Sequence, residues 1–398
     1  MTRPTARELT DPLLADDFYA SDEVFTHYAR LRTEAPVVWH EDPGFWIVSR
    51  HAEVYEVSID SDRFCSGQGI LPLEIGITYD TPPTMMHTDP PEHTQYRALV
   101  SPAFRPSRIR AMEAPIRARA RSLFDQLPLG EPVDVVGELT VPYPLMVISD
   151  LLGVPAEDWP RVFEWSEATI PGVTDWSEER RAELTDEMHR YFMALIAERR
   201  SAPQQDLISD LVVSEIDGRA LDDDELWMFL NQLLVAGNET TRNLLSGGLV
   251  ALAEAPDQYD RLRADRSLMP TAVDELLRWT TPVVAFMRTA TGPTELAGRT
   301  IGAGEHVHML YAAANRDEVV FGANAEQLDV GRDPNPHLAF GFGVHFCIGA
   351  ALARLEASVF LDELLDRVAR LDVAGPVERT PSGIIAGVRA ATLELTPA

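Results

Sequence analysis

The sequence predicts a mainly α-helical protein with a small β component, and three observations support this prediction. Most of the chain after Glu92 has the apolar spacing of helices. Short runs typical of strands occur near both ends of the chain. The 398 residues contain no glycine- or serine-rich linker, no charge block and no internal repeat, so we expect one large domain over residues 1–398.

The N-terminal part is predicted to contain short strands and one long loop. Residues 36–40 and 45–49 are strand-like runs, with Gly44 as the turn between them. Residues 64–92 are irregular and include two Pro-Pro pairs. Long irregular connections of this kind are often binding loops.

Helices are predicted through the middle of the chain, and the segment 222–254 is the most informative. It starts with an acidic run, ends before Pro256 and is about 50 Å long at 1.5 Å per residue. Its apolar residues lie nearly all round, which is typical of a buried helix, yet its middle reads AGNETT. Further helices are expected at 92–101, 107–127, 155–168, 176–200, 270–279 and after residue 349, and further strands at 283–287, 294–301, 305–311, 371–373 and 384–395.

Composition excludes several classes of function. The formal charge of −29 argues against nucleic acid or an anionic membrane as the main partner. All 34 basic residues are arginines, and without lysine neither Schiff-base chemistry nor a Walker-type phosphate loop is available. Two cysteines make no disulfide framework, and no signal peptide or ~20-residue apolar span is present, so we expect a cytoplasmic protein.

The loop 340–349, FGFGVHFCIG, presents Cys347 immediately before a predicted helix. A thiolate is favoured at a helix N-terminus, because free amides and the helix dipole point at it. Such a sulfur can attack a substrate, help to hold zinc or ligate haem iron, or it can be a buried structural cysteine. Zinc is the weakest of these because no CxxC or HExxH motif exists, and Cys65 has no comparable setting.

Three motifs together resemble those of the cytochrome P-450 monooxygenases. Phe340, Gly343, Cys347 and Gly349 match FxxGxxxCxG, residues 236–240 match (A/G)Gx(D/E)T, and Glu275 with Arg278 matches ExxR. The resemblance implies a single P-450-type domain, a triangular prism with a long central helix over the haem. It also implies haem b as cofactor, with Cys347 as the proximal metal ligand that promotes O–O cleavage.

The resemblance also implies residues that hold the haem. Arginine suits bidentate pairing with a propionate, glycine lets backbone pack against a flat ring, and Ala236 and Gly237 leave room above the iron. The expected cofactor-binding residues are His93, Arg97, Ala236, Gly237, Arg288, Phe340, Gly341, His345, Cys347 and Gly349.

Two further roles follow from the resemblance. Thr240 would hydrogen-bond iron-bound dioxygen and Glu239 would relay protons, the alternative being a local helix kink without catalysis. Glu275 and Arg278 would form a buried structural pair. The arginine that usually follows in a PERF-like motif is replaced by Gln327, so either Gln327 supplies a neutral donor or Arg332 takes its place.

Residues 105–121 carry six arginines against one acid, Glu113. This stretch is either a solvated helix face or a docking surface for an acidic electron donor, presented by Arg105, Arg108, Arg110 and Arg117. No GxGxxG fingerprint is present, so a ferredoxin-type donor and its reductase are expected to be separate proteins.

The resemblance places the substrate pocket at the segments 67–88, 162–173, 233–240, 283–287 and 383–385. Their apolar character predicts a hydrophobic substrate of terpenoid, steroid or fatty-acyl type. The expected lining is Ile70, Leu71, Ile75, Met85, Met86, Leu233, Val283, Val284, Phe286, Ile384 and Ile385. The predicted reaction is hydroxylation with O2; the alternatives are a non-turnover haem-thiolate sensor and a peroxide-driven peroxygenase, which would not need the Glu239–Thr240 pair.

Overall fold

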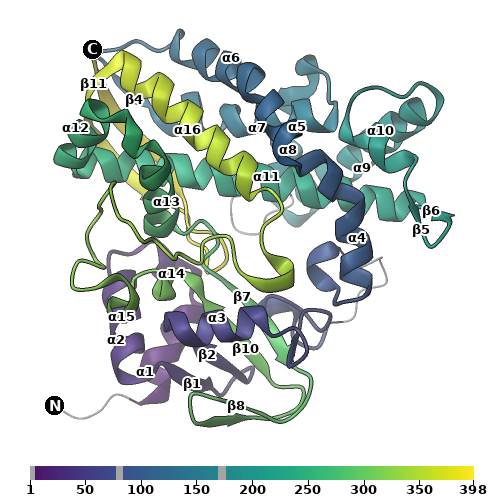
Figure 1. Cartoon of the computed structure of the whole chain (residues 1–398), viewed down its shortest axis with the longest axis vertical. Helices are drawn as coiled ribbons and strands as arrows, with labels where there is room; N and C mark the ends of the chain where they lie inside the picture. Colours follow the sequence, from purple (N-terminus) through teal and green to yellow (C-terminus); the bar gives the residue numbers. More distant parts are fainter. Residues whose placement is uncertain (1–4, 78–83, 169–175) are drawn as a thin grey trace.

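The computed structural model describes residues 5–77, 84–168 and 176–398, and helices dominate it (Figure 1). The parts of the predicted pocket at 78–83 and 169–173 lie outside the described residues. Within the described part, no helix combines the length and the apolar character needed to cross a bilayer.

The helix α11, Asp223–Glu254, runs across the whole molecule beneath α16 (Figure 1). It begins with a capping box, in which Asp222 and Glu225 each accept a hydrogen bond from the backbone N–H of the other. It ends before α12, whose first residue is Pro256. Helix α11 packs against α7, Pro142–Leu152, α13, Met269–Thr280, and α16, Ala350–Arg367.

Two apolar clusters meet along α11. Leu226, Leu230 and Leu234 of its N-terminal half pack with residues of α8 and α9. Leu244 and Leu249 of its C-terminal half pack with residues of α13, α16 and the C-terminal strands. The AGNETT segment lies between the two clusters, so the polar middle of α11 is placed at the centre of the molecule.

The remaining helices surround α11, and some were not predicted. Eight of the described helices are absent from the predicted set: α1, α2, α3, α7, α10, α12, α14 and α15. The helix predicted over 107–127 is two helices, because Pro115 has no N–H to bond the carbonyl of Ala111. The other helices are α1 Ala6–Thr10, α2 Val24–Glu34, α3 His51–Ile59, α4 Glu92–Val100, α5 Pro106–Ala111, α6 Glu113–Phe124, α8 Trp159–Ala168, α9 Glu178–Ser201, α10 Leu207–Val212, α12 Pro256–Ala264, α14 Tyr311–Ala314 and α15 Glu318–Phe321.

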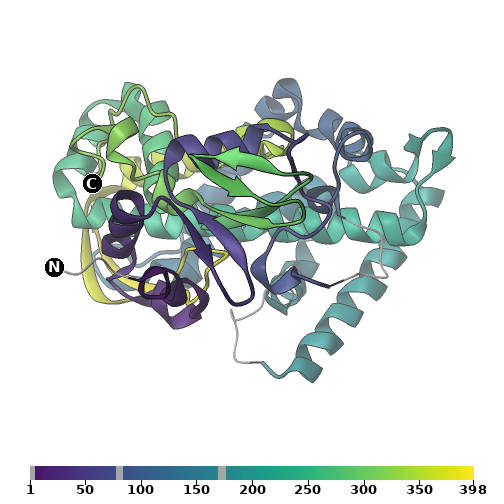
Figure 2. The same cartoon turned by 90° about the horizontal axis from the view of Figure 1, so that it is seen from below.

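A five-stranded sheet with the order β1-β2-β10-β7-β3 lies below α11 in Figure 1 and in front of it in the view from below (Figure 2). Strand β10 pairs in parallel with β2, and the other neighbours pair antiparallel. The strands are β1 Val37–His40, β2 Phe45–Val48, β3 Phe64–Cys65, β7 Ala285–Ala290 and β10 His306–Leu310.

Three smaller sheets complete the fold. The strand predicted over 294–301 is a hairpin of β8, Thr294–Leu296, and β9, Arg299–Ile301, because Ala297 and Gly298 both have positive φ and form its turn. The C-terminal sheet has the order β11-β12-β4, and β5 pairs with β6. Their bounds are β4 Pro132–Asp134, β5 Glu215–Ile216, β6 Arg219–Ala220, β11 Val368–Arg379 and β12 Val388–Pro397.

Candidate active site

The loop before α16 holds Cys347 in a fixed position. The N–H of Cys347 donates to the carbonyl of Phe340 at 2.9 Å, which closes the loop, and Gly349 is the N-cap of α16. Gly341 and Gly343 both have positive φ, and a Cβ on Gly343 would overlap the carbonyl oxygen of Ser58 in α3. Only glycine therefore allows this loop to pack against α3.

Opposing effects act on the Cys347 thiol, which is half-buried. Burial raises its pKa, whereas the backbone N–H of Gly349 and the guanidinium groups of Arg97 and Arg354 lower it. These groups favour the thiolate and would support a metal–sulfur bond. Ile348, the next residue, packs against the same apolar cluster to which Leu233 of α11 belongs.

One face of α11 is accessible in the middle of the helix. Ala236 is exposed and Thr240 half-buried, although the residues around them on α11 are mostly buried and lie at the centre of the fold. These two residues are four positions apart and so share a face. The hydroxyl of Thr240 donates to the carbonyl of Ala236 at 2.7 Å.

Gly237, the neighbour of Ala236 in the chain, lies where α11 approaches α7. A Cβ at Gly237 would lie 2.9 Å from Cδ1 of Ile148 on α7. The glycine therefore permits close packing of α11 against α7. Helix packing is thus one reason for a glycine here, and the expectation that Gly237 also leaves room above the iron remains a prediction.

Glu239 is buried and points toward α8. Its Oε2 accepts a hydrogen bond from Arg242 at 2.6 Å, and Arg242 also donates to Glu167 of α8 at 2.7 Å. Burial raises the pKa of Glu239 to about 8, with Glu167 raising it further and Arg242 opposing the shift. Its Oε1 has no partner among the described residues. Glu239 can therefore hold a proton near neutral pH, next to Thr240 in the chain.

Four basic side chains converge beside the cysteine loop. The rings of His93 and His345 lie 4.2 Å apart between centroids, and Ser66 contacts His345 at 3.0 Å. Burial lowers the pKa of His93, Arg97 and Arg288, and the mutual repulsion of this group adds to burial in lowering that of His345 to about 2.

Within the described residues, no member of the converging basic group has an ion-pair partner, although Asp89 lies near enough to raise the pKa of His93 and Arg288 in part. No carboxylate lies within ion-pair distance of Arg97 or Arg288 there, and His93 Nε2 is buried without a partner. Arg288 is a buried cation without an ion-pair partner, which is costly, so this arrangement suits an anion. Together with the thiol and the open face of α11, the residues fit a flat group that carries carboxylates and a metal, as haem does.

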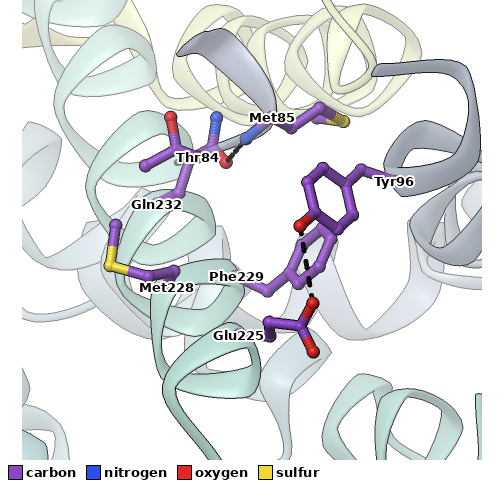
Figure 3. A pocket seen from close by; sticks show the side chains of 7 residues that line it. All are labelled: Thr84, Met85, Tyr96, Glu225, Met228, Phe229 and Gln232. Carbon is purple, nitrogen blue, oxygen red and sulfur yellow. Dashed lines mark hydrogen bonds between the residues drawn. The ribbon is translucent and has the colours of Figure 1, made fainter. Parts of the chain in front are cut away.

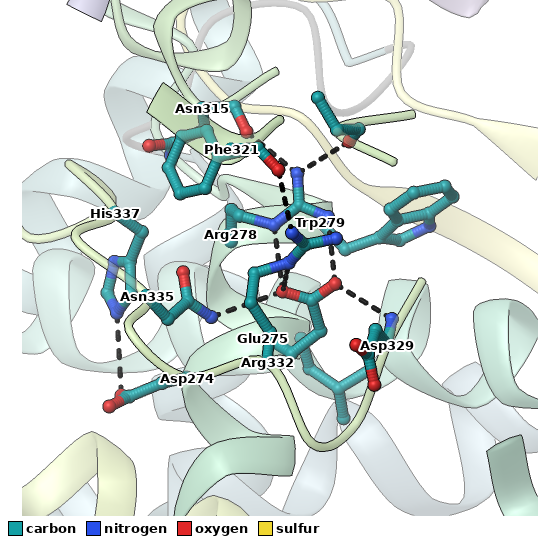
Figure 4. A network of polar contacts seen from close by, with 12 residues as sticks. Asp274, Glu275, Arg278, Trp279, Asn315, Phe321, Asp329, Arg332, Asn335 and His337 are labelled. Carbon is teal, nitrogen blue, oxygen red and sulfur yellow. Dashed lines mark hydrogen bonds and ion pairs between the residues drawn. The ribbon is translucent and has the colours of Figure 1, made fainter. Parts of the chain in front are cut away.

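A buried polar network supports the segment leading to Cys347 (Figure 4). Arg278 forms two hydrogen bonds of 2.8 Å to the carboxylate of Glu275, and Arg332 adds a third at 3.0 Å. Gln327 contributes only its backbone carbonyl, which accepts from Arg278 and Arg332 at 3.1 Å. Of the two possibilities that the sequence left open, the structure selects Arg332.

The segments expected to line the substrate pocket are connected to one another. Val283 forms a β-bridge with Ile385, and the N–H of Met287 donates to the carbonyl of Ile70 at 2.6 Å. Val284 is buried in the apolar core around Leu310, and its place in the pocket remains a prediction. Of the other expected residues, Leu71, Ile75, Met86, Val283, Phe286, Ile384 and Ile385 are half-buried, and Ile70, Met85 and Leu233 are buried.

A narrow cavity of about 10 Å³ lies further along α11, and the sequence did not predict most of its lining (Figure 3). Gln232, four residues before Ala236, accepts a hydrogen bond from the N–H of Met85 at 3.2 Å. Tyr96 contacts Glu225 at 3.4 Å. The remaining lining residues are Thr84, Met228 and Phe229. The i−4 spacing from Ala236 was the available signal for Gln232.

The arginine-rich stretch is partly neutralised. Arg117 is half-buried and pairs with Glu113, Asp362 and Glu363, so its charge is largely compensated, and its part in a docking surface remains a prediction. Arg108 pairs with Asp210 at 2.9 Å. Arg105 and Arg110 are exposed, and among the described residues neither has a carboxylate within ion-pair distance. The available positive charge is therefore smaller than the sequence suggests.

Comparison with known proteins agrees with this geometry. Residues 130–370 match the family model described as Cytochrome P450. The chain is 36% identical to a steroid C26-monooxygenase of Mycolicibacterium smegmatis, covering 91% of this chain and 88% of the relative. It is also 36% identical to a linalool 8-monooxygenase of Pseudomonas putida, covering 96% and 98%. A solved Mycobacterium marinum cytochrome P450 in complex with pseudoionone superposes with a TM-score of 0.89, at 37% identity over 96% of this chain and 97% of that chain.

Proposed function

The chain belongs to the cytochrome P450 family and is a monooxygenase, and we propose that it hydroxylates a neutral terpenoid-type molecule with electrons from a separate ferredoxin. Its cofactor is haem, and we assign haem b, bound without a covalent link. The proposed reaction takes place in the cytoplasm and consumes O2. The convergence of Cys347, four basic side chains and the open face at Ala236 and Thr240 carries this proposal.

Cys347 is the proposed iron ligand. A haem held by a thiolate supplies the activation of dioxygen and the cleavage of its O–O bond. Arg97, Arg288 and His345 would hold the propionates, because their own positive charge or N–H groups have no carboxylate partner among the described residues. The N–H groups after Cys347 would stabilise the sulfur, and Gly349 keeps the approach to it free of a side chain.

Glu239 and Thr240 are the proposed proton-handling residues. Glu239 holds a proton near pH 7 because its pKa is about 8, and its free Oε1 can pass the proton on. The Thr240 hydroxyl lies on the open face, where it can hydrogen-bond an oxygen substrate. Arg242 orients the Glu239 carboxylate by a 2.6 Å hydrogen bond. This pair favours O2-dependent turnover over a sensor or a peroxide-driven enzyme.

The substrate class rests on the pocket and on the relatives. The half-buried residues proposed to line the substrate pocket are apolar. Gln232 and Tyr96, which line the narrow cavity, add polar atoms. Apolar walls with few polar groups suit a molecule with one oxygen function. The names of the linalool 8-monooxygenase and of the pseudoionone complex support a terpenoid over a steroid or a fatty acyl chain.

The decisive experiment is a reduced, carbon-monoxide difference spectrum of the wild type and of Cys347→Ser. Thiolate-ligated haem gives a strongly red-shifted Soret band, which we expect in the wild type only. A wild-type spectrum like that of imidazole-ligated haem would exclude Cys347 as the ligand. Titration with linalool, a steroid and a fatty acid, read by the spin state of the iron, then tests the substrate class; the tightest binding should be to linalool.

A further inference from the structure

A second cavity lies one turn beyond Thr240 along α11, between α2, the end of α13 and the connection from β11 to β12. Its volume is about 250 Å³. Its walls include Tyr28, Asn243, Val250, Trp279 and Gly387. None of these residues belongs to the cysteine loop or to the basic group beside it, so the proposed catalytic residues do not account for this cavity.

The cavity contains buried polar atoms without partners. Tyr28 and Asn243 are each 1% exposed, and neither the Tyr28 hydroxyl nor the two amide heteroatoms of Asn243 has a hydrogen-bond partner among the described residues. Leaving such groups unpaired costs about 1–3 kcal/mol each. Other polar groups of the same wall are satisfied: Tyr19 donates to the carbonyl of Leu13 at 2.8 Å, and Thr280 to that of Leu276. The unpaired atoms are therefore a specific set that suits a ligand with one polar group.

The charges around the cavity favour a neutral ligand. Arg316 is already paired with Glu326 at 3.0 Å, and its guanidinium stacks on Trp279 at 3.5 Å. The remaining charged wall residues, Asp22, Glu254 and Arg379, have both signs. The aromatic and aliphatic surfaces of Trp279 and Val250 suit an apolar ring system.

The cavity also contacts the back of segments expected to line the substrate pocket. Its wall includes Val284 and Ala386. The N–H of Val284 donates to the carbonyl of Ile384 at 2.9 Å, and the N–H of Ala386 donates to that of Pro282 at 2.9 Å. A ligand that presses on this wall can therefore shift Val283 and Ile385, which pair with each other and belong to the proposed pocket.

We propose that this cavity is a second ligand site for a neutral, ring-containing molecule with a single hydroxyl group, and that its occupancy changes the affinity of the substrate pocket. The ligand hydroxyl accepts a hydrogen bond from the Tyr28 hydroxyl and donates one to the Asn243 side-chain carbonyl. The inference that a ligand binds here depends only on the cavity and its residues. The inference that the ligand changes substrate affinity rests on the proposed function.

The test is calorimetric titration of 1-naphthol into the haem-loaded full chain, with 4-phenylimidazole present to occupy the iron side. One naphthol molecule should bind per chain. Tyr28→Phe and Asn243→Leu should each weaken it about tenfold, as expected for one lost hydrogen bond. Tyr19→Phe is the matched control and should bind like the wild type, and naphthalene should bind about tenfold more weakly than naphthol. Absence of binding, or equal affinity in all variants, overturns the site.

The coupling is tested separately by linalool titrations read from the spin state of the iron. Naphthol should shift the apparent linalool dissociation constant at least threefold in the wild type and in Tyr19→Phe, but not in Tyr28→Phe combined with Asn243→Leu. An equal shift in the double variant, or none in the wild type, overturns the coupling. A protein without a thiolate-type haem spectrum would defeat the proposed function, while the naphthol calorimetry would still report on the cavity.

Discussion

Nη2 of Arg242 lies 2.6 Å from Oε2 of Glu239, one turn away on α11, and this contact orients the buried carboxylate of the residue that precedes Thr240. Burial nevertheless keeps the pKa of Glu239 at about 8. The group is therefore mostly protonated at pH 7, although its charged form has an arginine partner. A group whose pKa is near the working pH can both accept and release a proton efficiently.

Glu239→Gln and Thr240→Ala should both uncouple oxygen consumption from product formation. The glutamine keeps the shape and the contact to Arg242 but cannot exchange a proton, and the alanine removes the hydroxyl on the open face. Oxygen-electrode and product measurements on the same reaction give the ratio, which we expect to fall about tenfold or more. Unchanged coupling in both variants would remove these residues from proton handling.

The same carboxyl predicts a pH dependence of stability. The folded state keeps the Glu239 proton up to pH ~8, whereas the unfolded chain loses it near its ordinary pKa. The folded state then binds more protons, so this group lowers stability progressively as the pH rises from about 4.5 to 8. Glu239→Gln lacks this loss, so its melting temperature should increase relative to the wild type between pH 6 and 8. A constant difference would contradict the raised pKa.

Arg332→Gln should destabilise the protein, whereas Gln327→Ala should have little effect. Arg332 reaches buried Glu275 at 3.0 Å and three backbone carbonyls, while the Gln327 side chain has no part in the network. Removing one partner of a buried ion pair lowers the free energy of unfolding by about 3 kcal/mol. Urea unfolding of both variants, with haem absorbance as a second signal, measures the difference. An equal loss of stability in the two variants would mean that the Gln327 side chain also stabilises the network around Glu275.

Gly343→Ala should be far more damaging than Gly341→Ala. Both glycines have positive φ, which costs alanine about 1 kcal/mol. Only at Gly343 would the added Cβ meet backbone, the carbonyl oxygen of Ser58, whereas at Gly341 the nearest atom is 4.0 Å away. Thermal melts and the haem content of the purified variants give the comparison. Similar melting temperatures would show that the loop can move away from α3.

Arg105→Glu and Arg110→Glu should slow electron transfer from an acidic ferredoxin. These two arginines are exposed, so charge reversal weakens the electrostatic attraction of the donor to this surface. It also reduces the dependence of the electron-transfer rate on salt concentration. Arg119→Gln is a suitable control because Arg119 pairs with Asp150 at 3.1 Å. Stopped-flow reduction at two ionic strengths measures the effect. Rates equal to wild type in both reversal variants would place the donor elsewhere.

Local signals in the sequence were enough to predict much of the molecule. The family, the mainly helical fold and the central helix from its acidic start to Pro256 all follow from short-range patterns. Caps, proline breaks and glycine-hinged loops act over a few residues, so they can be read without knowing the fold. The motif around Cys347 belongs to this class as well.

Contacts between distant residues were decided only by the tertiary structure. Gly237 faces Ile148, Arg332 reaches Glu275, and Arg117 is neutralised by Asp362 and Glu363. Each outcome depends on which elements pack together, because a charge or a missing side chain has no fixed partner along the chain. The unpaired atoms of Tyr28 and Asn243 are of the same kind, since burial without a partner arises only when separate segments fold against one another.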